Sequence, residues 1–394
     1  MSAQTILPGT TASGQQTTLG VMGGGQLGRM FVHAAQRMGY FTAVLDPDPV
    51  SPAGLVSHFH IQTDYLDEQG LAQLMQRCAA ITTEFENVPS PALFTLGAHR
   101  PVAPGANAVS IAQDRIKEKA HFVRCGVPCA PYVVITTPEQ LVGVADGLLP
   151  GILKTAKLGY DGKGQVRVAD RAALQVAWAE LKSVPCVLEA MLPLQAECSV
   201  IVVRGWDGAI VNFPVQLNEH RAGILAVTEV YEGNVPSALS SQAVDAAKSI
   251  ANELQYVGVL CVEFFVVAGE NGQSALVVNE IAPRPHNSGH YTMDACDESQ
   301  FDLQVRALAG LPLQQPRQHS PAIMLNLLGD LWKDGATPPW DQVLALPGTH
   351  LHLYGKLKAS KGRKMGHLNI TGATIGQVRD TAARAAGLLS IAFA

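Results

Sequence analysis

Two apolar runs carry one acidic residue each: Val259-Leu260-Cys261-Val262-Glu263-Phe264 and Leu276-Val277-Val278-Asn279-Glu280, with Asn271-Gly272 between them. Asn-Gly is the strongest two-residue hairpin signal, so the runs are predicted to pair as antiparallel strands. With Asn271-Gly272 at the tip, Glu263 lies directly across from Glu280 on one face, with Cβ atoms about 4.5 to 5.5 Å apart. Two carboxylates at that distance repel, and Mg²⁺, which takes one or two carboxylates with water and phosphate oxygens, relieves the repulsion. The alternative is a solvated acidic edge, which the apolar flanks disfavour.

A glycine-rich loop at 157–165 reads Lys-Leu-Gly-Tyr-Asp-Gly-Lys-Gly-Gln and joins two predicted strands at 151–155 and 165–168. Because it links strand to strand, it is neither a Rossmann turn nor a Walker loop. Its glycines keep side chains away from a bulky polyanion, and Lys154 on the preceding strand can supply the compact positive charge that phosphates need. The pattern predicts a phosphate-binding loop. The alternative is a flexible hairpin tip with exposed lysines.

Another glycine pattern, Gly23-x-Gly25-x-x-Gly28, follows an apolar run at 17–22 and opens a helix. With Asp46 at the end of the next predicted strand, it fits the fingerprint in which backbone amides bind a pyrophosphate and an acid binds a ribose hydroxyl. A glycine turn at the edge of a doubly wound sheet, whose amides meet some other anion, fits equally well. The sequence leaves both interpretations open.

Two polar segments are candidates for substrate contacts. The first, Ala282-Pro283-Arg284-Pro285-His286-Asn287-Ser288-Gly289-His290, leaves the second strand of the hairpin, and such loops often carry substrate-binding groups. The second is a basic cluster of Lys356, Lys358, Lys361, Arg363 and Lys364. A charge run of this kind is an ordinary solvated face or, where a phosphate dianion binds, a set of converging donors.

The composition indicates a globular α/β protein. The 394 residues are 47% hydrophobic and 15% charged, with 37 Gly and 24 Pro, which excludes a disordered or coiled-coil chain. The net charge of −5 disfavours general nucleic-acid binding, and no apolar run approaches the roughly 18 to 20 residues that span a bilayer. Seven cysteines without a Cys-x-x-Cys pair, and an N-terminus without a signal-peptide pattern, predict a cytoplasmic protein with free thiols.

The element patterns divide the chain into a tail and three units. Residues 1–16 are predicted to be a loose tail, and residues 17–112 a Rossmann-like parallel sheet with helices. Residues 113–192 read as a small α+β module with helices at 112–124 and from about 138. Residues 193–394 read as a larger α+β unit, in which a Pro/Gln-rich linker at 311–318 leads into another β region and a closing helix at 371–386.

Together, the phosphate loop, the paired acids and the order of the units resemble the ATP-grasp superfamily. Within it, several strings resemble the N5-carboxyaminoimidazole ribonucleotide synthase family and occur in the same order. They are Gly23-Gly24-Gly25-Gln26-Leu27-Gly28-Arg29-Met30, Glu84-Phe85-Glu86-Asn87-Val88-Pro89, the loop at 159–165, residues 283–290 and Gly362-Arg363-Lys364-Met365-Gly366-His367-Leu368-Asn369. The resemblance implies a three-unit ATP-grasp fold, with an N-terminal Rossmann-like domain, a lid and a C-terminal domain.

The same resemblance implies a ligase of purine biosynthesis that acts as a homodimer. Its substrates would be ATP, bicarbonate and aminoimidazole ribonucleotide, and its products carboxyaminoimidazole ribonucleotide, ADP and phosphate. Bicarbonate is a poor electrophile, and phosphoryl transfer from ATP would activate it as carboxyphosphate. The exocyclic amine would then capture the carboxyl group, or CO₂ released from it, in a site closed by the lid at 113–192.

The resemblance also implies roles for individual residues. Those expected to contact ATP are Arg115, Lys154, Gly159, Tyr160, Asp161, Gly162, Lys163, Gly164, Gln165, Glu189, Ala190, Met191, Leu192, Glu197, His220, Asn279 and Glu280. Those expected to surround the ribonucleotide and bicarbonate are Gln26, Tyr160, Arg284, His286, Asn287, Lys356, Arg363 and Lys364. The expected catalytic residues are Lys154, Tyr160 and Arg284, and the expected Mg²⁺ ligands are Glu263 and Glu280. The chain departs from the family pattern at Leu158, where a further glycine is common, and at Pro285, where Val is frequent.

Two other classes of protein are alternatives. A nicotinamide oxidoreductase would use the first glycine loop, but it leaves the acid pair and the second glycine loop unexplained. A phosphate-binding or nucleic-acid-binding module built on the basic cluster explains only the few residues near 356–364.

Overall fold

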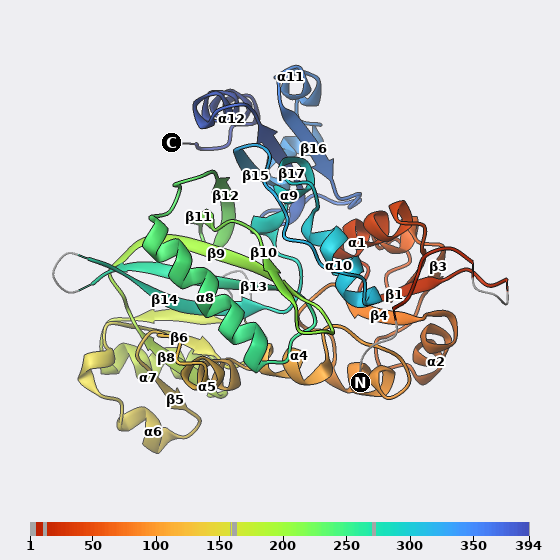
Figure 1. The fold of residues 1–394 in the computed structure, drawn as a ribbon. Helices are drawn as coiled ribbons and strands as arrows, with labels where there is room; N and C mark the ends of the chain where they lie inside the picture. Colours follow the sequence, from red (N-terminus) through yellow and green to blue (C-terminus); the bar gives the residue numbers. More distant parts are fainter. Residues whose placement is uncertain (1–4, 11–13, 158, 160–163, 270–272, 394) are drawn as a thin grey trace.

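A computed structural model describes residues 5–10, 14–157, 159, 164–269 and 273–393 of the chain. The N-terminal domain is a parallel sheet with the strand order β3-β2-β1-β4 (Figure 1). Its strands are β1 (Thr18–Met22), β2 (Phe41–Leu45), β3 (Phe59–Ile61) and β4 (Ala80–Thr83), and its helices are α1 (Gln26–Arg37), α2 (Glu68–Arg77) and α3 (Ser90–Gly97). β1 is buried along its whole length, as expected for a parallel strand. The predicted Rossmann-like sheet is confirmed.

The segment before β1 is attached to the body of the protein at Ile6. The Tyr40 hydroxyl donates a hydrogen bond to the Ile6 carbonyl at 2.6 Å, and the Ile6 N–H donates to the carbonyl of Ala309 at 2.8 Å. The Ile6 side chain packs against buried residues of the N-terminal domain. This part of the segment predicted to be a loose tail is therefore held in place.

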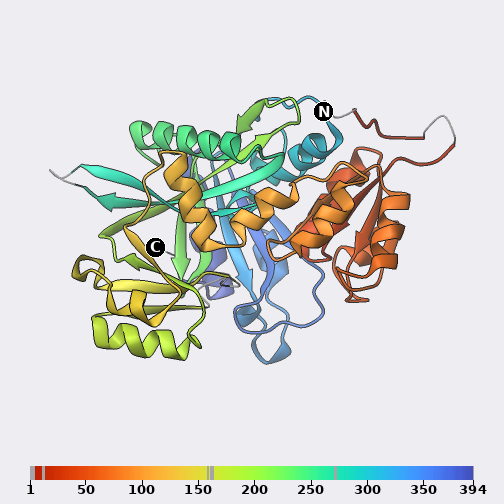
Figure 2. The same cartoon turned by 90° about the horizontal axis from the view of Figure 1, so that it is seen from below.

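Two helices, α4 (Ala106–Ala112) and α5 (Arg115–Arg124), lead from this domain to a second, smaller sheet (Figure 2). The predicted helix at 112–124 begins instead at Arg115, because the Asp114 side chain accepts a hydrogen bond from the Ile116 N–H and caps α5. The small sheet is antiparallel, with the order β5-β8-β6-β7. Its elements are β5 (Tyr132–Ile135), α6 (Pro138–Val142), β6 (Gly151–Thr155), β7 (Gln165–Val168), α7 (Arg171–Glu180) and β8 (Cys186–Ala190).

The large antiparallel sheet has the order β14-β13-β9-β11-β12-β15-β17-β16, and β10 pairs with β9. Its strands are β9 (Leu194–Arg204), β10 (Ile210–Asn212), β11 (Gln216–Arg221), β12 (Ile224–Val230), β13 (Gly258–Ala268), β14 (Ser274–Ala282), β15 (Ala322–Leu328), β16 (Thr349–Leu353) and β17 (Lys364–Thr371). The helices after β12 are α8 (Ser237–Glu253), α9 (Thr292–Ala295), α10 (Gln300–Ala309), α11 (Trp340–Leu344) and α12 (Ile375–Leu389). α8 lies across the central strands, and its apolar face packs on them (Figure 1).

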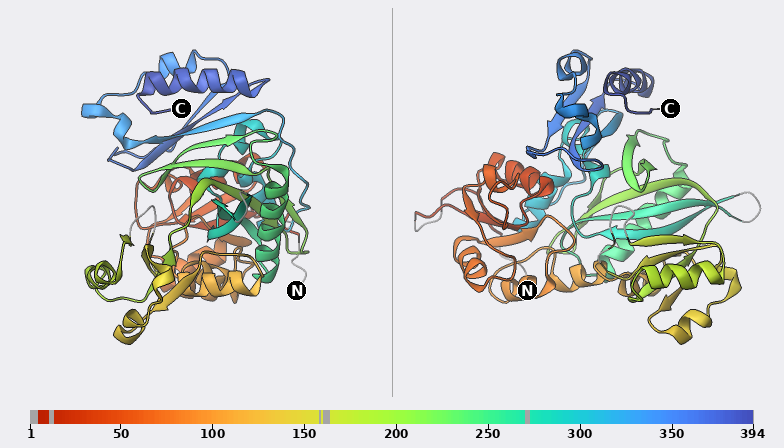
Figure 3. Two further views of the ribbon diagram at one scale, coloured as in Figure 1. Left: turned by 90° about the vertical axis from the view of Figure 1, so that its left-hand side faces the viewer. Right: turned by 180° about the vertical axis from the view of Figure 1, so that it is seen from behind.

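The C-terminal strands continue the large sheet, because β15 pairs with β12 and β17 pairs with β15. They and α12 lie on the side of the molecule away from the small sheet (Figure 3). The predicted closing helix at 371–386 is shifted, since Thr371 still belongs to β17 and the Thr374 side chain caps a helix that runs from Ile375 to Leu389. Among the described residues, no helix is both long enough and apolar enough to cross a lipid bilayer.

Candidate active site

The pairing of Glu263 with Glu280 across β13 and β14 is confirmed, but the predicted turn register is wrong by one residue. At the turn end of the hairpin Ala268 pairs with Ser274, whereas a two-residue turn at Asn271-Gly272 would pair it with residue 275. The register shifts at Glu263/Phe264, where Asn279 is the extra residue of a β-bulge. The bulge offsets the error, so both acids lie on one face. Asn271-Gly272 itself lies outside the described residues.

Each of the two acids pairs with a nitrogen atom of a basic side chain. His286 Nε2 lies 2.9 Å from Glu263 Oε1, and Arg115 Nη1 lies 3.2 Å from Glu280 Oε2. Burial alone would raise the pKa of Glu263, but the charge and hydrogen bond of His286, together with the charges of His220 and Arg284, lower it to about 2. Glu263 is therefore an anion at neutral pH, which a metal ligand requires.

Lys154 of β6 and Glu189 of β8 form a buried charged group with Lys119 of α5. Lys154 Nζ lies 3.1 Å from one Glu189 carboxylate oxygen, and Lys119 Nζ lies 3.2 Å from the other. Burial lowers the pKa of Lys154, and the charges of Arg115 and Lys119 lower it further, against the opposing effect of Glu189. Burial would raise the pKa of Glu189, but the two lysines hold it below its usual value. The Lys154 amine is thus held by Glu189 on the strand that leads into the second glycine loop.

The second glycine loop is described only at its ends. Thr155 N–H donates to the Gly164 carbonyl at 2.8 Å, and Gly164 has a φ of +72°, which favours glycine. Gln165 begins β7 and pairs with Lys154 in the ladder. The expected site residues Tyr160, Asp161, Gly162 and Lys163 lie outside the described residues, as does Leu158.

Residues 189–192 leave the small sheet and enter the large one. Ala190 N–H donates to the Pro131 carbonyl and Met191 N–H to the Pro150 carbonyl, so the backbone is held while the Met191 side chain is 47% exposed. The expected pair of Glu197 and His220 lies on neighbouring strands, with His220 Nδ1 2.5 Å from Glu197 Oε2. Burial would lower the pKa of His220, but its hydrogen bond to Glu197 and the charges of the nearby glutamates raise it.

The first glycine loop is occupied by carboxylates of this same chain. Gly24 N–H donates to Asp46 Oδ2 at 2.7 Å, while Gly25 and Gly28 N–H donate to the two Glu84 oxygens at 3.0 and 3.2 Å. A Cβ atom at Gly25 would lie 2.6 Å from Glu84 Oε1, so the glycine is needed for the close approach. The dinucleotide interpretation is therefore wrong here, because the amides and the acid are already paired with each other or with Glu84.

Arg284 is held by the same segment that fills the glycine loop. Its Nε donates to Glu86 Oε2 at 2.8 Å, and its Nη2 also pairs with that oxygen. Burial would lower the pKa of Arg284, but the Glu86 charge and hydrogen bond raise it, so the guanidinium stays charged. Glu84 and Glu86 thus connect the first glycine loop to Arg284.

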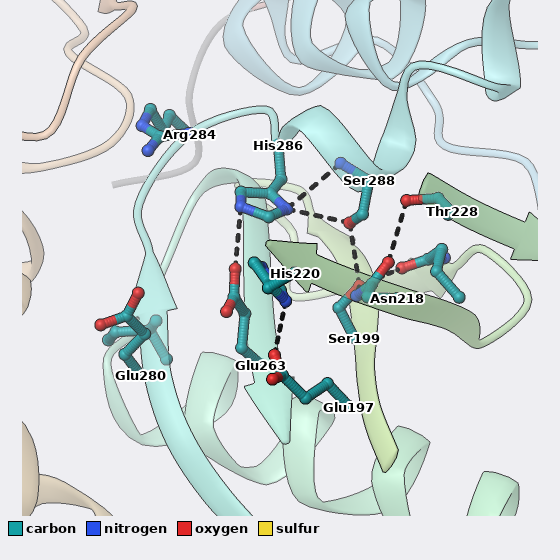
Figure 4. Close-up of polar contacts among 12 residues, drawn as sticks. Glu197, Ser199, Asn218, His220, Thr228, Glu263, Glu280, Arg284, His286 and Ser288 are labelled. Carbon is teal, nitrogen blue, oxygen red and sulfur yellow. Dashed lines mark hydrogen bonds and ion pairs between the residues drawn. The ribbon is translucent and has the colours of Figure 1, made fainter. Parts of the chain in front are cut away.

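His286 lies in a chain of buried hydrogen bonds, shown in Figure 4. Its Nε2 faces Glu263, and its Nδ1 lies 2.9 Å from Ser288 Oγ, which lies 2.8 Å from Ser199 Oγ. The adjacent Asn287 is buried, and neither its amide nitrogen nor its amide oxygen has a hydrogen-bond partner among the described residues. Since buried polar groups are almost always paired, Asn287 is suited to receive a polar ligand.

The basic cluster lies partly in ordered backbone contacts. Lys356 Nζ donates to the Lys364 carbonyl at 2.7 Å, and Arg363 Nη1 donates to the Lys358 carbonyl at 2.7 Å. Gly355, beside Lys356, approaches Arg29 on α1, where an added Cβ would lie 3.4 Å from the guanidinium. Gln26 is the first residue of the same helix, so the cluster and the start of α1 belong to neighbouring parts of the structure.

Three family descriptions match successive parts of the chain. Residues 16–113 match the ribonucleotide synthetase preATP-grasp domain, residues 120–301 the ATP-grasp domain, and residues 322–381 the phosphoribosylaminoimidazole carboxylase C-terminal domain. The chain is 40% identical to the N5-carboxyaminoimidazole ribonucleotide synthase of Bacillus subtilis (strain 168) over 369 residues, which cover 93% of each protein. The chain belongs to the N5-carboxyaminoimidazole ribonucleotide synthase family.

Other members of this synthase family agree. The enzyme of Brucella melitensis is 42% identical over 89% of this chain and 95% of its own. An N5-carboxyaminoimidazole ribonucleotide synthetase solved as an ADP complex has a TM-score of 0.88 at 39% identity, covering 98% of both chains. The Aspergillus clavatus synthase, solved with ADP and aminoimidazole ribonucleotide, has a TM-score of 0.85 at 30% identity over 95% and 98% of the chains.

The predicted resemblance and fold class are confirmed. The chain is an ATP-dependent ligase with N5-carboxyaminoimidazole ribonucleotide synthase activity in purine biosynthesis.

Four residues of this synthase site were not predicted to have a role: Glu84, Glu86, Glu118 and Lys119. Glu84 and Glu86 were noted only as part of a segment that resembles the family, with no role assigned to either. Glu118 and Lys119 lie with Arg115 on one face of α5, at helical spacing, and both are buried. A helix face that carries so many charges is usually exposed to solvent. The sequence therefore gave no sign that this face is buried.

Proposed function

We propose that this synthase binds ATP between the small sheet and the large sheet, and binds bicarbonate and aminoimidazole ribonucleotide beside Arg284 and His286. The observation that carries the proposal is a series of contacts that runs from the lid to the substrate loop. Glu189 on the lid contacts Lys154 and Lys119, and Arg115, on the same helix as Lys119, contacts Glu280. Glu280 pairs across the two strands with Glu263, which contacts His286. Groups from the lid, the large sheet and the substrate loop therefore share one site.

The nucleotide end is formed by the lid, residues 113–192. Lys154 and Arg115 supply positive charge for the phosphates, and the loop at 159–165 supplies backbone amides and Lys163. The backbone at Glu189–Leu192 would receive the base, and Glu197 with His220 the ribose. These assignments rest on the family resemblance and on the convergence of Lys154, Glu189 and Arg115 described above.

The residues at the hairpin fit a Mg²⁺ ion. Glu263 and Glu280 are cross-strand partners on one face, and Asn279 Oδ1 is buried without a hydrogen-bond partner among the described residues. Oxygen donors of this kind are the ligands that Mg²⁺ prefers. When bound, Mg²⁺ would neutralise charge on the β- and γ-phosphates during transfer. The residues expected to hold it are Glu263 and Glu280, with Asn279 beside them.

The other substrates lie toward Arg284 and His286. Arg284, kept charged and oriented by Glu86, would hold bicarbonate and then carboxyphosphate. Asn287 would donate and accept hydrogen bonds with the aminoimidazole, since both of its polar atoms are otherwise unpaired among the described residues. Gln26, Tyr160, Lys356, Arg363 and Lys364 would complete the ribonucleotide site, with the basic residues around the 5′-phosphate.

The reaction then proceeds in two steps. A bicarbonate oxygen takes the γ-phosphoryl group, which leaves ADP and carboxyphosphate, and Lys154 stabilises the charge that develops. The exocyclic amine next forms a bond to the carboxyl carbon, either as the bond from that carbon to the phosphate oxygen breaks or after that bond has broken to release CO₂. Phosphate leaves, and the proton lost by the amine passes to it. Closure of the lid excludes water, which would otherwise hydrolyse carboxyphosphate.

A homodimeric state and a cytoplasmic location belong to the same proposal. The first rests on the family resemblance, and the second on that resemblance together with the seven cysteines, which are all free thiols. Light scattering on the purified protein and fractionation of cells would test them.

The decisive experiment measures phosphate release with ATP, Mg²⁺ and bicarbonate, with and without aminoimidazole ribonucleotide. We expect release to depend on the ribonucleotide. Arg284→Lys should abolish most of it, because Lys cannot keep the paired contacts to Glu86. Arg317→Lys, on an arginine whose side chain is 78% exposed, is the matched control and should behave as the parent. Release without the ribonucleotide at the full rate, or a fully active Arg284→Lys, would contradict the proposal.

A further inference from the structure

Cys261, Glu263 and His286 bring three different donor atoms together beside the active site. The Cys261 sulfur, a Glu263 carboxylate oxygen and a His286 ring nitrogen all lie within 4.8 Å of one another. Cys261 and Glu263 are alternate residues of β13 and share a face, while His286 comes from the loop that follows β14. Cys261 has no part in the proposed reaction, so its position beside the other two calls for its own explanation.

We propose that these three residues form a binding site for Zn²⁺, distinct in chemistry from the Mg²⁺ pair. Sulfur, nitrogen and carboxylate oxygen are the three donors that zinc combines in proteins, whereas Mg²⁺ takes oxygen ligands almost alone. Three protein ligands leave a fourth position for water, as in open zinc sites. The donor set therefore selects zinc over the magnesium that accompanies ATP.

Binding of zinc requires the three donor atoms to shift from their present positions. Zinc bonds of about 2.0 Å to nitrogen and oxygen and about 2.3 Å to sulfur place tetrahedral ligands roughly 3.3 to 3.8 Å apart. His286 Nε2 and Glu263 Oε1 already lie 2.9 Å apart and would separate slightly. The sulfur, within 4.8 Å of both, would move inward. Cys261 is fully buried, but Glu263 and His286 each keep partial exposure of their side chains, 13% and 11%, through which an ion can enter.

The surroundings support the histidine as a metal ligand. A zinc-bound histidine usually donates its other ring N–H to a fixed acceptor. His286 Nδ1 lies 2.9 Å from Ser288 Oγ and accepts a hydrogen bond from the Ser288 N–H at 3.3 Å. When a metal takes Nε2, Nδ1 instead donates to Ser288 Oγ, which turns its own hydrogen toward Ser199 Oγ, 2.8 Å away. On binding, the imidazole proton moves from Nε2 to Nδ1 and the thiol proton of Cys261 is released to solvent. The thiolate, the carboxylate and Zn²⁺ then sum to zero charge.

Zinc at this site would inhibit the synthase, because it occupies Glu263 and His286, which the reaction needs for other purposes. Glu263 would no longer be available to Mg²⁺, and His286 could not turn toward the ribonucleotide. This consequence rests on the proposed function, whereas binding of the metal does not. The test therefore measures binding first, without nucleotide.

The binding test uses Co²⁺ as a spectroscopic substitute for zinc, added to the purified full-length protein freed of metal. Coordination should give the near-ultraviolet absorption of a cobalt–thiolate bond, and Zn²⁺ should remove it. Cys261→Ser should abolish this band and weaken zinc binding about tenfold or more. Cys125→Ser is the matched control, since Cys125 Sγ also lies 3.4 Å from a histidine nitrogen, of His121, and that variant should keep the band. Cys261→Ala provides a second replacement, with melting temperature as the check on folding.

The cobalt band tests the binding site, and inhibition by zinc tests the effect of that site on the reaction. A band that depends on Cys261 supports the site, and inhibition of phosphate release by zinc that is weakened about tenfold in Cys261→Ser supports its effect on the reaction. The absence of the band in the parent protein, or its persistence in both Cys261 variants, would overturn the site whether or not the enzyme makes carboxyaminoimidazole ribonucleotide. A Cys261-dependent band without inhibition would overturn the effect on the reaction alone.

Discussion

Between acid and neutral pH the parent protein should become less stable, and replacing Glu118 by Gln should make the free energy of unfolding fall much less over that range. Glu118 lies on α5, is 3% exposed, and accepts a hydrogen bond from the Ile281 N–H at 2.8 Å. Burial raises the pKa of this carboxyl to about 7, against the opposing charges of Arg115 and Lys119. Gln keeps an oxygen for Ile281 but has no proton to lose, so the variant separates the hydrogen bond from the ionisation.

The stability that Glu118 contributes falls as the pH rises, because folding raises the pKa of its carboxyl group. Folding raises the pKa of Glu118 from 4.5 to about 7, so the folded protein holds a proton that the unfolded chain releases. The resulting stabilisation is complete below about pH 4.5 and is lost as the pH rises through 7. The shift from 4.5 to about 7 is about 2.5 units, and at roughly 1.4 kcal/mol for each unit the upper limit of the loss is about 3.5 kcal/mol.

The assay is urea unfolding of the parent and of Glu118→Gln at about pH 5, 6, 7 and 8. The free energy of unfolding of the variant relative to the parent should rise across this range by up to about 2.5 kcal/mol, because part of the loss occurs below pH 5, while other titrating groups cancel in the difference. Glu180→Gln, at an exposed end of α7, is the matched control and should show a constant difference. A pH-independent difference for Glu118→Gln would refute the reasoning, because it would mean that Glu118 stays ionised in the folded protein.

Three further predictions concern the site. Glu280→Gln should weaken binding of Mg²⁺-nucleotide and lower turnover by about 10² or more. It should change stability by at most about 1 kcal/mol, since the ion pair of Glu280 with Arg115 is partly exposed. ATP titrations at several Mg²⁺ concentrations check this, and full activity of the variant would contradict it. Arg363→Ala should raise the KM for the ribonucleotide much more than that for ATP, and equal changes would exclude a role at the 5′-phosphate. Asp46→Ala, like the parent, should show no NAD binding measurable by calorimetry. The variant should lose about 1 to 3 kcal/mol of stability, because the Gly24 N–H and the Tyr65 hydroxyl lose their acceptor. Specific NAD binding by the parent or the variant would restore the dinucleotide interpretation.

The hairpin shows what a sequence pattern can and cannot fix. The two apolar runs and the Asn-Gly signal were enough to predict the strands β13 and β14 and the pairing of Glu263 with Glu280. The bulge at Asn279 could not be predicted, because an extra residue in one strand has no local signature in this sequence. The pairing was correct only because the bulge and the misplaced turn each shift the register by one residue in opposite senses.

The ion pairs of the site could not be predicted from the sequence, for a different reason. Arg115 and Glu280 are separated by 165 positions, and Arg284 and Glu86 by 198, so no spacing rule relates them. The sequence predicted a helix at 112–124 but gave no indication of which side of it would be buried. The burial of Lys119 and Glu118 depends on Glu189 and β14 covering that face, which is a property of the assembled sheets.

The first glycine loop shows why a motif must be judged by its partners. Its amides do bind carboxylates, as a Rossmann turn binds a pyrophosphate, but the carboxylates belong to Asp46 and Glu84. Burial raises the pKa of Glu84, and the hydrogen bonds from the glycine amides, together with the charge of Arg284, limit that rise. Two residues further on, Glu86 fixes Arg284. The glycines therefore serve the substrate site indirectly: they hold the segment that orients the arginine, and a side chain at Gly25 would displace that segment before it affected any ligand.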